Sequence, residues 1–268
     1  MSVTVGPHRF TASPLARRNP TVKLVLLFMI SLAMMFVFDP VTPAVLYLIG
    51  LVAVLASARI PARILLLAHI PFVGFAFGLL MVNALSRPGE VVLDMIGLRV
   101  IVEGLTVGAS LAFRTMVIGI LSIAFVASTD GVSLMTSLHQ HARLSARVTY
   151  AILAGYRMLQ EMPHEWRLIR HAHAVRAPLR SNGQPSSGLR VFGRAAFSLL
   201  VVSLRKGERM AESLESRGLG LPERSTWRPV PLGRADWVFA VAVLTALVLV
   251  LVTSAALGYL EGFDALFI

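Results

Sequence analysis

The apolar positions of the chain are concentrated in long runs that are separated by polar segments. A helix that crosses the hydrocarbon core of a bilayer needs about 20 mostly apolar residues. The turn signals Asp39-Pro40 and Arg59-Ile60-Pro61 fall between neighbouring runs, and proline disfavours a helical residue before it. The pattern therefore predicts five transmembrane helices, over residues 22–38, 43–57, 64–85, 104–127 and 237–258.

The long segment 128–236 has a different pattern, in which apolar residues recur at helical spacing among many charges. This spacing is typical of amphipathic helices that lie outside the hydrocarbon core. The predicted elements are a helix over 133–162 with Ser133 as its N-cap, an interruption at Pro163, a helix over 164–177, a linker over 178–188 and a helix over 189–218.

One face of the last of these helices carries small and aliphatic residues at spacings of three and four. They are Leu200, Leu204, Gly207, Ala211, Leu214 and Gly218. Because a narrow stripe of this kind lets two helix backbones approach closely, we expect it to pack on another helix. The residues assigned to this packing are Leu204, Gly207, Ala211 and Leu214.

The composition agrees with a membrane protein. Hydrophobic residues make up 56% of the 268 residues, and the mean hydropathy is +0.74, which is high for a soluble domain of this length. The absence of cysteine excludes disulfides, thiolate metal sites and cysteine nucleophiles. We predict three parts: residues 1–127 with four transmembrane helices, a cytosolic region over 128–236, and the last transmembrane helix with an outer tail over 237–268.

The net charge of +11 is unevenly distributed, and this sets the predicted orientation. With five spans, the segments 1–23, 58–63 and 128–236 lie on one side of the membrane and hold nearly all the cations. The loop 86–103 has two arginines, and the C-terminal tail has none. Since cations mark the cytoplasmic side, the N-terminus and 128–236 are predicted to be cytosolic and the C-terminus outside. The basic segment also predicts binding to anionic lipids, whereas no nucleic-acid-binding motif is present.

Few polar groups lie within the predicted spans. Arg114 is near the middle of the fourth span, where an isolated charge costs about 2.5–3.5 kcal/mol, so we expect it to face protein in a structural role, against the cytosolic region or on backbone carbonyls. His69 is expected to bond to a neighbouring helix. The pairs His139/His141 and His171/His173 predict no metal site, because residues two apart on a helix point about 200° from each other.

Two other classes of protein remain as alternatives. A membrane-embedded enzyme would need a convergent polar site, but the spans offer only Arg114, His69 and Asn83 and no carboxylate. A self-contained permease would need a polar pathway, and no internal repeat or pathway is apparent. No catalytic residue is predicted. No G-x-x-x-x-G-K-[ST] motif is present, so ATP hydrolysis would require another chain.

Both cytosolic helical arms are predicted to end on an arginine. One ends at Val175-Arg176-Ala177 before Pro178, and the other ends at Ser216-Arg217-Gly218. In one interpretation each arginine only caps its helix, which stabilises the last turn by about 0.3–1 kcal/mol. In the other, each planar guanidinium projects beyond the helix and binds a carboxylate in a groove of a partner.

These stretches resemble the transmembrane T component of energy-coupling factor (ECF) transporters, which are ABC-type transporters; the family includes the cobalt and biotin uptake T proteins. That family carries two Ala-Arg-Gly-like triplets at the ends of cytosolic coupling helices. The similar stretches here are "ARRNPTVKLVLL" (16–27), "LAFRTMVIGILSIAFVASTD" (111–130), "AGYRMLQEMPHEWRLIRHAHAVRA" (154–177) and "AESLESRGLG" (211–220).

The resemblance implies an all-α integral membrane protein of a prokaryotic plasma membrane, with about five transmembrane helices plus cytosolic amphipathic coupling helices. It implies that two cytosolic ABC-type ATPase subunits bind the triplets and that a membrane substrate-binding (S) subunit selects a vitamin or a transition metal. The chain itself then needs no cofactor, since ATP and Mg²⁺ are bound by the ATPases. The implied ATPase-binding residues are Val175, Arg176, Ala177, Ser216, Arg217 and Gly218.

Overall fold

The computed structural model describes residues 13–58, 60–86, 91–95, 98–176, 188–219, 221 and 229–259. The chain forms two compact units. We call Met1–Asp130 together with Pro231–Ile268 the membrane unit, and Gly131–Val230 the arm unit. The last predicted span belongs to the same compact unit as the first four.

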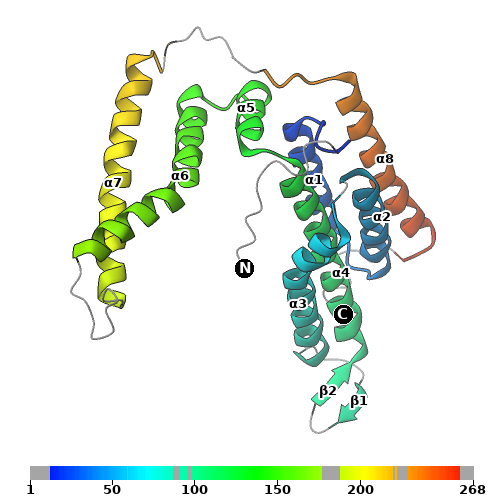
Figure 1. Ribbon diagram of the computed structural model, residues 1–268. Coiled ribbons are helices and arrows are strands. Elements are labelled where there is room, and N and C mark those ends of the chain that lie inside the picture. Colours follow the sequence, from blue (N-terminus) through cyan, green and yellow to red (C-terminus); the bar gives the residue numbers. More distant parts are fainter. Residues whose placement is uncertain are drawn as a thin grey trace. The chain divides into compact units, whose positions relative to one another are not determined.

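The membrane unit contains a helix at each of the five predicted spans (Figure 1). Four of these helices are long and apolar enough to cross a membrane, and α1, with 15 residues, is shorter. The prediction of an all-α membrane fold is confirmed, with four helices of spanning length and a shorter apolar helix at the first predicted span. The helices are α1 (Pro20–Met34), α2 (Val41–Ala58), α3 (Ala62–Ser86), α4 (Val102–Ser128) and α8 (Arg234–Ala256).

The helix α4 packs against α1, α2 and α3, so it lies at the centre of the membrane unit. Its close contact with α3 depends on glycine. A Cβ on Gly104 would overlap the carbonyl oxygen of Asn83, and one on Gly108 would lie 2.9 Å from the carbonyl oxygen of Leu80. Small residues at such positions allow close backbone approach between membrane helices. On the other side of α4, Ile120 is fully buried in an apolar cluster with α2.

Side chains hold α8 to the rest of the unit at both of its ends. Near its start, Asp236 accepts a hydrogen bond from the backbone N–H of Asn19 at 2.9 Å. Near its end, the hydroxyl of Ser254 contacts that of Thr42, which is in the first turn of α2. Asp39 accepts a bond from the Thr42 N–H at 2.6 Å, so the predicted Asp39-Pro40 turn also stabilises the start of α2.

A short hairpin between α3 and α4 was not predicted. β1 (Val91–Met95) and β2 (Leu98–Ile101) pair antiparallel within the polar loop that joins the two spans. Both strands are rich in valine, leucine and isoleucine, which suit a pleated strand. The segment is too short to add a span, so the helical membrane architecture is unchanged.

The arm unit contains α5 (Gly131–His141), α6 (Ala146–Arg176) and α7 (Leu189–Ser216). The predicted single helix over 133–162 is therefore wrong, because the chain turns between α5 and α6. Arg143 has a φ of +54°, a left-handed conformation that no α-helix continues through. Ser145 then accepts a bond from the Val148 N–H at 3.4 Å. Ser133 lies within α5, which begins two residues earlier, and is not its N-cap.

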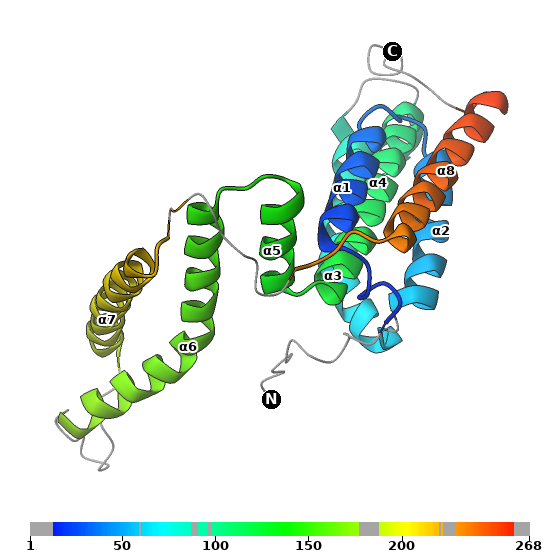
Figure 2. The same cartoon turned by 90° about the horizontal axis from the view of Figure 1, so that it is seen from above.

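The predicted interruption at Pro163 is also wrong, because α6 continues through this residue to Arg176. A proline inside a helix removes one backbone hydrogen bond and bends the helix more readily than it ends it when packing supports both sides. The ribbon of α6 changes direction along its length (Figures 1 and 2). Trp166, just after the proline, packs edge-on against Phe192 of α7, with ring centroids 5.3 Å apart.

Candidate functional site

The second arginine triplet is a glycine-capped end of α7. Gly218 has a φ of +79° and donates its N–H to the Glu215 carbonyl at 2.8 Å. The N–H of Leu219 donates to the Leu214 carbonyl at 2.9 Å. These two bonds form the Schellman motif, in which a left-handed residue, usually glycine, follows the helix C-cap. Arg217 is that C-cap residue.

The Arg217 side chain is not required for this cap. The backbone N–H groups of Gly218 and Leu219 already satisfy two of the last carbonyls of α7. Arg217 is exposed, as is Ser216, and its guanidinium has no hydrogen bond or ion pair with another described residue. Gly218 is half-buried beneath Leu221, whose N–H bonds to the Gly218 carbonyl at 3.2 Å. A rigid backbone end thus presents a free cation.

The first triplet lies at the end of α6. Arg176 is the last residue of this helix and is exposed, and Val175 beside it is 88% exposed. The Arg176 guanidinium likewise makes no ion pair within the described part of the chain. Ala177 and the predicted linker residues 178–187 lie outside the described residues. An exposed valine beside an exposed arginine combines an apolar contact with a charge at one helix tip.

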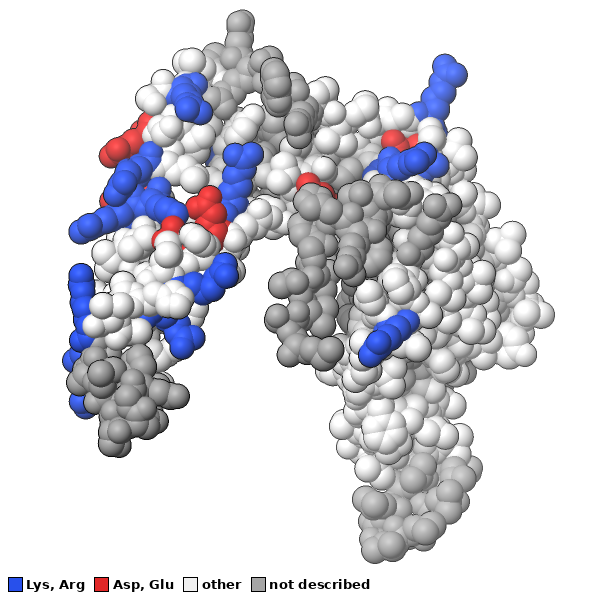
Figure 3. All heavy atoms as spheres, in the orientation of Figure 1, with Lys and Arg blue, Asp and Glu red and all other residues white. Residues whose placement is uncertain are grey.

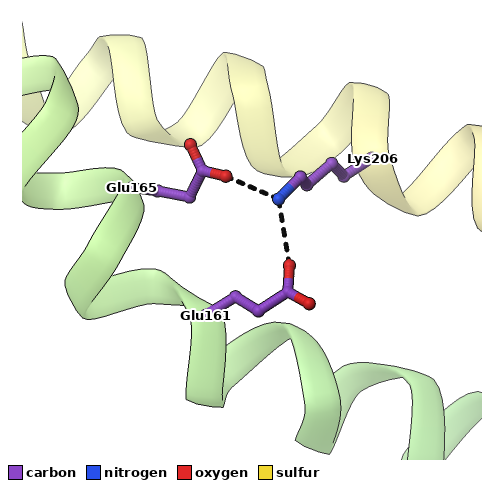
Figure 4. Close-up of polar contacts among 3 residues, drawn as sticks. All are labelled: Glu161, Glu165 and Lys206. Carbon is purple, nitrogen blue, oxygen red and sulfur yellow. Dashed lines mark hydrogen bonds and ion pairs between the residues drawn. The ribbon is translucent and has the colours of Figure 1, made fainter.

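Contacts between α6 and α7 are antiparallel. His173 of α6 contacts the Ser198 hydroxyl at 3.2 Å, and further back along α6 the carboxylate of Glu165 accepts from Lys206 at 2.6 Å. Lys206 also donates to Glu161 at 3.0 Å (Figure 4). The hydrogen bond from Lys206 lowers the pKa of the Glu165 carboxyl. The bonds from Glu165 and then Glu161 raise the pKa of Lys206.

This arrangement places the two exposed arginines at opposite ends of the helix pair. Arg176 and Arg217 each lie about three helical turns, or about 16 Å of helix, from the Glu165–Lys206 ion pair. Because the helices are antiparallel, these two lengths extend in opposite directions. The ion pair thus links the two helices that carry the arginine tips at a point between those tips.

The predicted stripe on α7 does not face α6. The residues of α7 that contact α6, among them Phe192, Ser198 and Lys206, lie on another side of the helix. Leu200 and Leu204 are both 63% exposed. The stripe residues Gly207 and Ala211 are also open: no atom lies within 4 Å of a Cβ built on Gly207, and Ala211 is exposed, whereas Leu214 is half-buried. The stripe is thus available to another protein chain.

Cations cover the described surface of the arm unit. Figure 3 shows lysine and arginine gathered over α6 and α7, whereas the visible surface of the spans is mostly uncharged. The exposed arginines of these two helices are Arg147, Arg157, Arg167, Arg170, Arg176, Arg190, Arg194, Arg205 and Arg209, and Arg217 follows α7 as its exposed C-cap residue. Such a surface suits acidic proteins and anionic lipids.

Within the spans, Arg114 of α4 binds the residues that follow α1. It donates to the Val37 carbonyl at 2.6 Å, and its guanidinium lies 5.6 Å from the ring centroid of Phe38. Since Val37 lies beyond the end of α1, Arg114 satisfies a carbonyl that the helix leaves unpaired. His69 differs from the expectation, because its Nδ1 bonds to the Leu65 carbonyl of its own helix at 2.9 Å.

The membrane unit also contains a buried polar network that was not predicted from the sequence. Lys23 of α1 donates to the carbonyl of Ser128 at 2.8 Å and contacts its hydroxyl at 3.2 Å. Asn19 caps α1 by accepting from the Thr21 N–H, and its amide donates to the Pro231 carbonyl at 3.4 Å. A lysine inside the first predicted span and Asp236 beside the last one were signals that could have indicated such a network.

No metal site is apparent among the described residues, and the cavity among the spans is apolar. They contain no cluster of three histidine or acidic side chains that could hold a metal ion. A cavity of about 400 Å³ lies among α1, α2, α4 and α8, and its only polar side chains are Lys23 and Ser57. His139, His141 and His173 contact Leu144, Val230 and Ser198, respectively.

Comparison with known proteins gives one family. The model of the CbiQ family, described as a cobalt transport protein, matches residues 11–227. The match extends from just before α1 through the whole of α7 and covers most of the chain. A search of curated proteins finds no match.

Proposed function

Since this chain belongs to the CbiQ family of cobalt transport proteins, we propose that it is the subunit that couples ATP hydrolysis to uptake in an ECF transporter. It is a multi-pass membrane protein and a transport component. In the proposed complex, two cytosolic ABC-type ATPase subunits bind the arm unit. A separate membrane S subunit holds the substrate, and the ATPases, rather than this chain, bind ATP and Mg²⁺.

The observation that supports this proposal is the pair of exposed arginines at opposite ends of the α6–α7 pair. Arg176 and Arg217 are exposed, and neither has an ion-pair partner in the described part of the chain. A guanidinium forms two parallel hydrogen bonds with a carboxylate, which gives strength and a fixed orientation. Two such tips suit a pair of ATPases that each offer one acidic groove. Movement between the ATPases would then move α6 and α7.

Each tip also has a second feature that suits a partner. Gly218 follows Arg217 and closes the helix with a backbone cap, so Arg217 is presented at a helix end of defined conformation. Val175 precedes Arg176 and adds an apolar surface that the partner buries. We propose Val175, Arg176 and Ala177 as the contact for one ATPase, and Ser216, Arg217 and Gly218 as the contact for the other.

The exposed stripe on α7 is proposed as the contact with the S subunit. Leu204, Gly207, Ala211 and Leu214 lie along α7 away from α6, and a membrane helix of the S subunit can pack closely on small residues. The stripe and the Arg217 tip belong to one rigid helix. A displacement of the tip would therefore move the surface that holds the substrate subunit.

The cation distribution supports an orientation with the N-terminus and the arm unit in the cytosol of a prokaryotic cell and the C-terminus outside. The substrate is proposed to be a vitamin or a transition metal such as cobalt, which the family description mentions. The apolar cavity among the spans offers no array of polar ligands, which disfavours the alternatives of an enzyme and a self-contained permease.

The mass of the complex purified in mild detergent tests this function. The chain would be expressed together with candidate ATPases and a candidate S subunit and then weighed by native mass spectrometry. We expect one copy of the chain with two ATPase subunits and one S subunit. A chain that purifies without any ATPase, although all partners are present and folded, would contradict the coupling function.

A further inference from the structure

Both connections between the two units border the buried network at the start of α1. The first connection follows α4, and Lys23 holds the Ser128 carbonyl two residues before the membrane unit ends at Asp130. The second connection returns at Pro231, whose carbonyl accepts from the Asn19 amide. One helical turn of α1 therefore contacts the chain both where it leaves the membrane unit and where it re-enters.

Within the arm unit, the residue next to the second connection is hydrogen-bonded to α5. Val230 is the last residue of the arm unit, and its N–H donates to Gln140 at 3.0 Å. Its carbonyl contacts Nε2 of His141 at 2.9 Å. Val230 is thus bound to the end of α5, while the next residue, Pro231, is bound to α1.

The start of α5 is in turn seated against α6. A Cβ on Gly131 would lie 3.2 Å from the ring of Tyr156. Because α6 carries one of the arginine tips, a chain of packed contacts leads from α6 through α5 to Val230 and Pro231. Coupling between distant sites is carried by such contiguous packed and hydrogen-bonded groups.

The network is buried, and each of its polar side chains makes hydrogen bonds. Asn19 has 3% of its surface exposed, and Lys23 and Asp236 have 6% each. Asp236 accepts from the N–H groups of Asn19 and Gly233, each at 2.9 Å. Buried charges are costly unless they are paired or hydrogen-bonded, and within membranes they mark functional positions.

We propose that Asn19, Lys23 and Asp236 are positioning residues that pass the movement of the arm unit to α1, α4 and α8. This inference rests on the proposed coupling function. Without the network, the ATPases would still move α6, but the connections would yield locally and the spans would not follow. The defect would therefore appear as ATP hydrolysis without transport.

Two substitutions remove parts of the network with little other change. Lys23→Met keeps a long side chain but removes the ammonium. Asn19→Ser keeps an oxygen that caps α1 and removes the amide donor to Pro231, since serine and asparagine are similarly good N-caps. Ser31→Ala is a matched control, because among the described residues the Ser31 hydroxyl of α1 bonds to the Leu27 carbonyl of the same helix and to nothing outside it.

The test measures substrate uptake and ATP hydrolysis in proteoliposomes that contain the complete complex. We expect Lys23→Met to keep its ATPases and its hydrolysis rate but to transport about ten-fold less substrate per ATP, within the range of allosteric couplings. Asn19→Ser should show a smaller loss of the same kind, and Ser31→Ala should couple like the wild type.

Other outcomes would overturn this inference. Unchanged transport per ATP in Lys23→Met shows that the network does not pass movement, and an equal loss of hydrolysis and transport shows a purely structural role. If Lys23→Met does not accumulate, normal coupling in Asn19→Ser overturns the inference. A wild-type chain that binds no ATPase would contradict the proposed function itself. If the wild type and both variants transport the same amount of substrate per ATP, only the role proposed for Asn19, Lys23 and Asp236 is contradicted.

Discussion

Lys206 of α7 donates a hydrogen bond of 2.6 Å to Glu165 of α6, about three helical turns from each arginine tip. The same ammonium reaches Glu161 at 3.0 Å, so one side chain joins two turns of α6 to α7. Because α6 and α7 are antiparallel, this link lies between Arg176 and Arg217 and joins the two helices that carry them. It is therefore the first contact to disturb.

Lys206→Met should loosen the α6–α7 pair while leaving each helix intact. The methionine cannot donate to either glutamate, whereas Lys206→Arg keeps a cationic donor and is the matched control. Since the chain has no cysteine, two introduced cysteines can carry spin labels without background. The distribution of distances between labels on exposed positions of α6 and α7 should broaden in Lys206→Met. An unchanged distribution would show that the link does not hold the pair.

The same distance should depend on pH in acid and in strong alkali but not near neutrality. The pKa of Glu165 is lowered by Lys206, so the stabilisation is present above the ordinary glutamate pKa of about 4.3 and is lost as pH falls through the lowered value. The pKa of Lys206 is raised, so its stabilisation is present below the ordinary lysine pKa and is lost as pH rises through the raised value. Spin-label distances in wild type should broaden only at these two extremes. If the distances in Lys206→Met broaden with pH as much as in the wild type, another titrating group would be responsible.

Gly218→Ala should weaken the end of α7. A left-handed conformation costs a residue with a Cβ about 1–2 kcal/mol, and the added Cβ would lie 2.7 Å from Leu221. We expect faster hydrogen exchange in the last turn of α7 and weaker ATPase binding. Gly207→Ala is the control within the same helix, since nothing lies within 4 Å of its Cβ; it should stabilise α7 by about 0.5–1 kcal/mol. Equal exchange in both variants would argue against the glycine cap.

Arg114→Leu should destabilise the membrane unit. It leaves the Val37 carbonyl without the donor at 2.6 Å, and an unsatisfied buried acceptor costs about 1–3 kcal/mol. Arg114→Lys retains a donor and should be less harmful. Unfolding in mixed detergent micelles measures the difference, and equal stability of Arg114→Leu and wild type would show that this bond contributes nothing.

The spans can be predicted from the sequence because a bilayer demands long apolar runs, and such runs are visible without tertiary information. The break between α5 and α6 is harder to predict from the sequence. Apolar spacing continues across it, and the left-handed Arg143 gives no compositional sign such as glycine. Pro163 wrongly predicts the end of a helix, because packing between Trp166 and Phe192 supports the helix beyond it.

The arginine tips were identifiable as helix ends, but their relationship was not. Only the contacts of Lys206 and His173 establish that α6 and α7 are antiparallel and that the tips point apart. The buried network was hidden for a similar reason. Asn19 binds residues more than 200 positions away in the sequence, and Lys23 binds Ser128, which is 105 positions away. Such distant pairings have no local pattern in a single sequence.

The central claim, that Arg176 and Arg217 bind two ATPases, is tested most directly by charge reversal at both tips. The double variant Arg176→Glu/Arg217→Glu is compared with Arg170→Glu/Arg205→Glu, which makes the same change in charge on exposed arginines away from the tips. The measurement is the number of ATPase copies that co-purify with the folded chain. We predict two copies for wild type and for the control and none for the tip variant. Equal retention by both variants would show that the arginines are not the ATPase contacts.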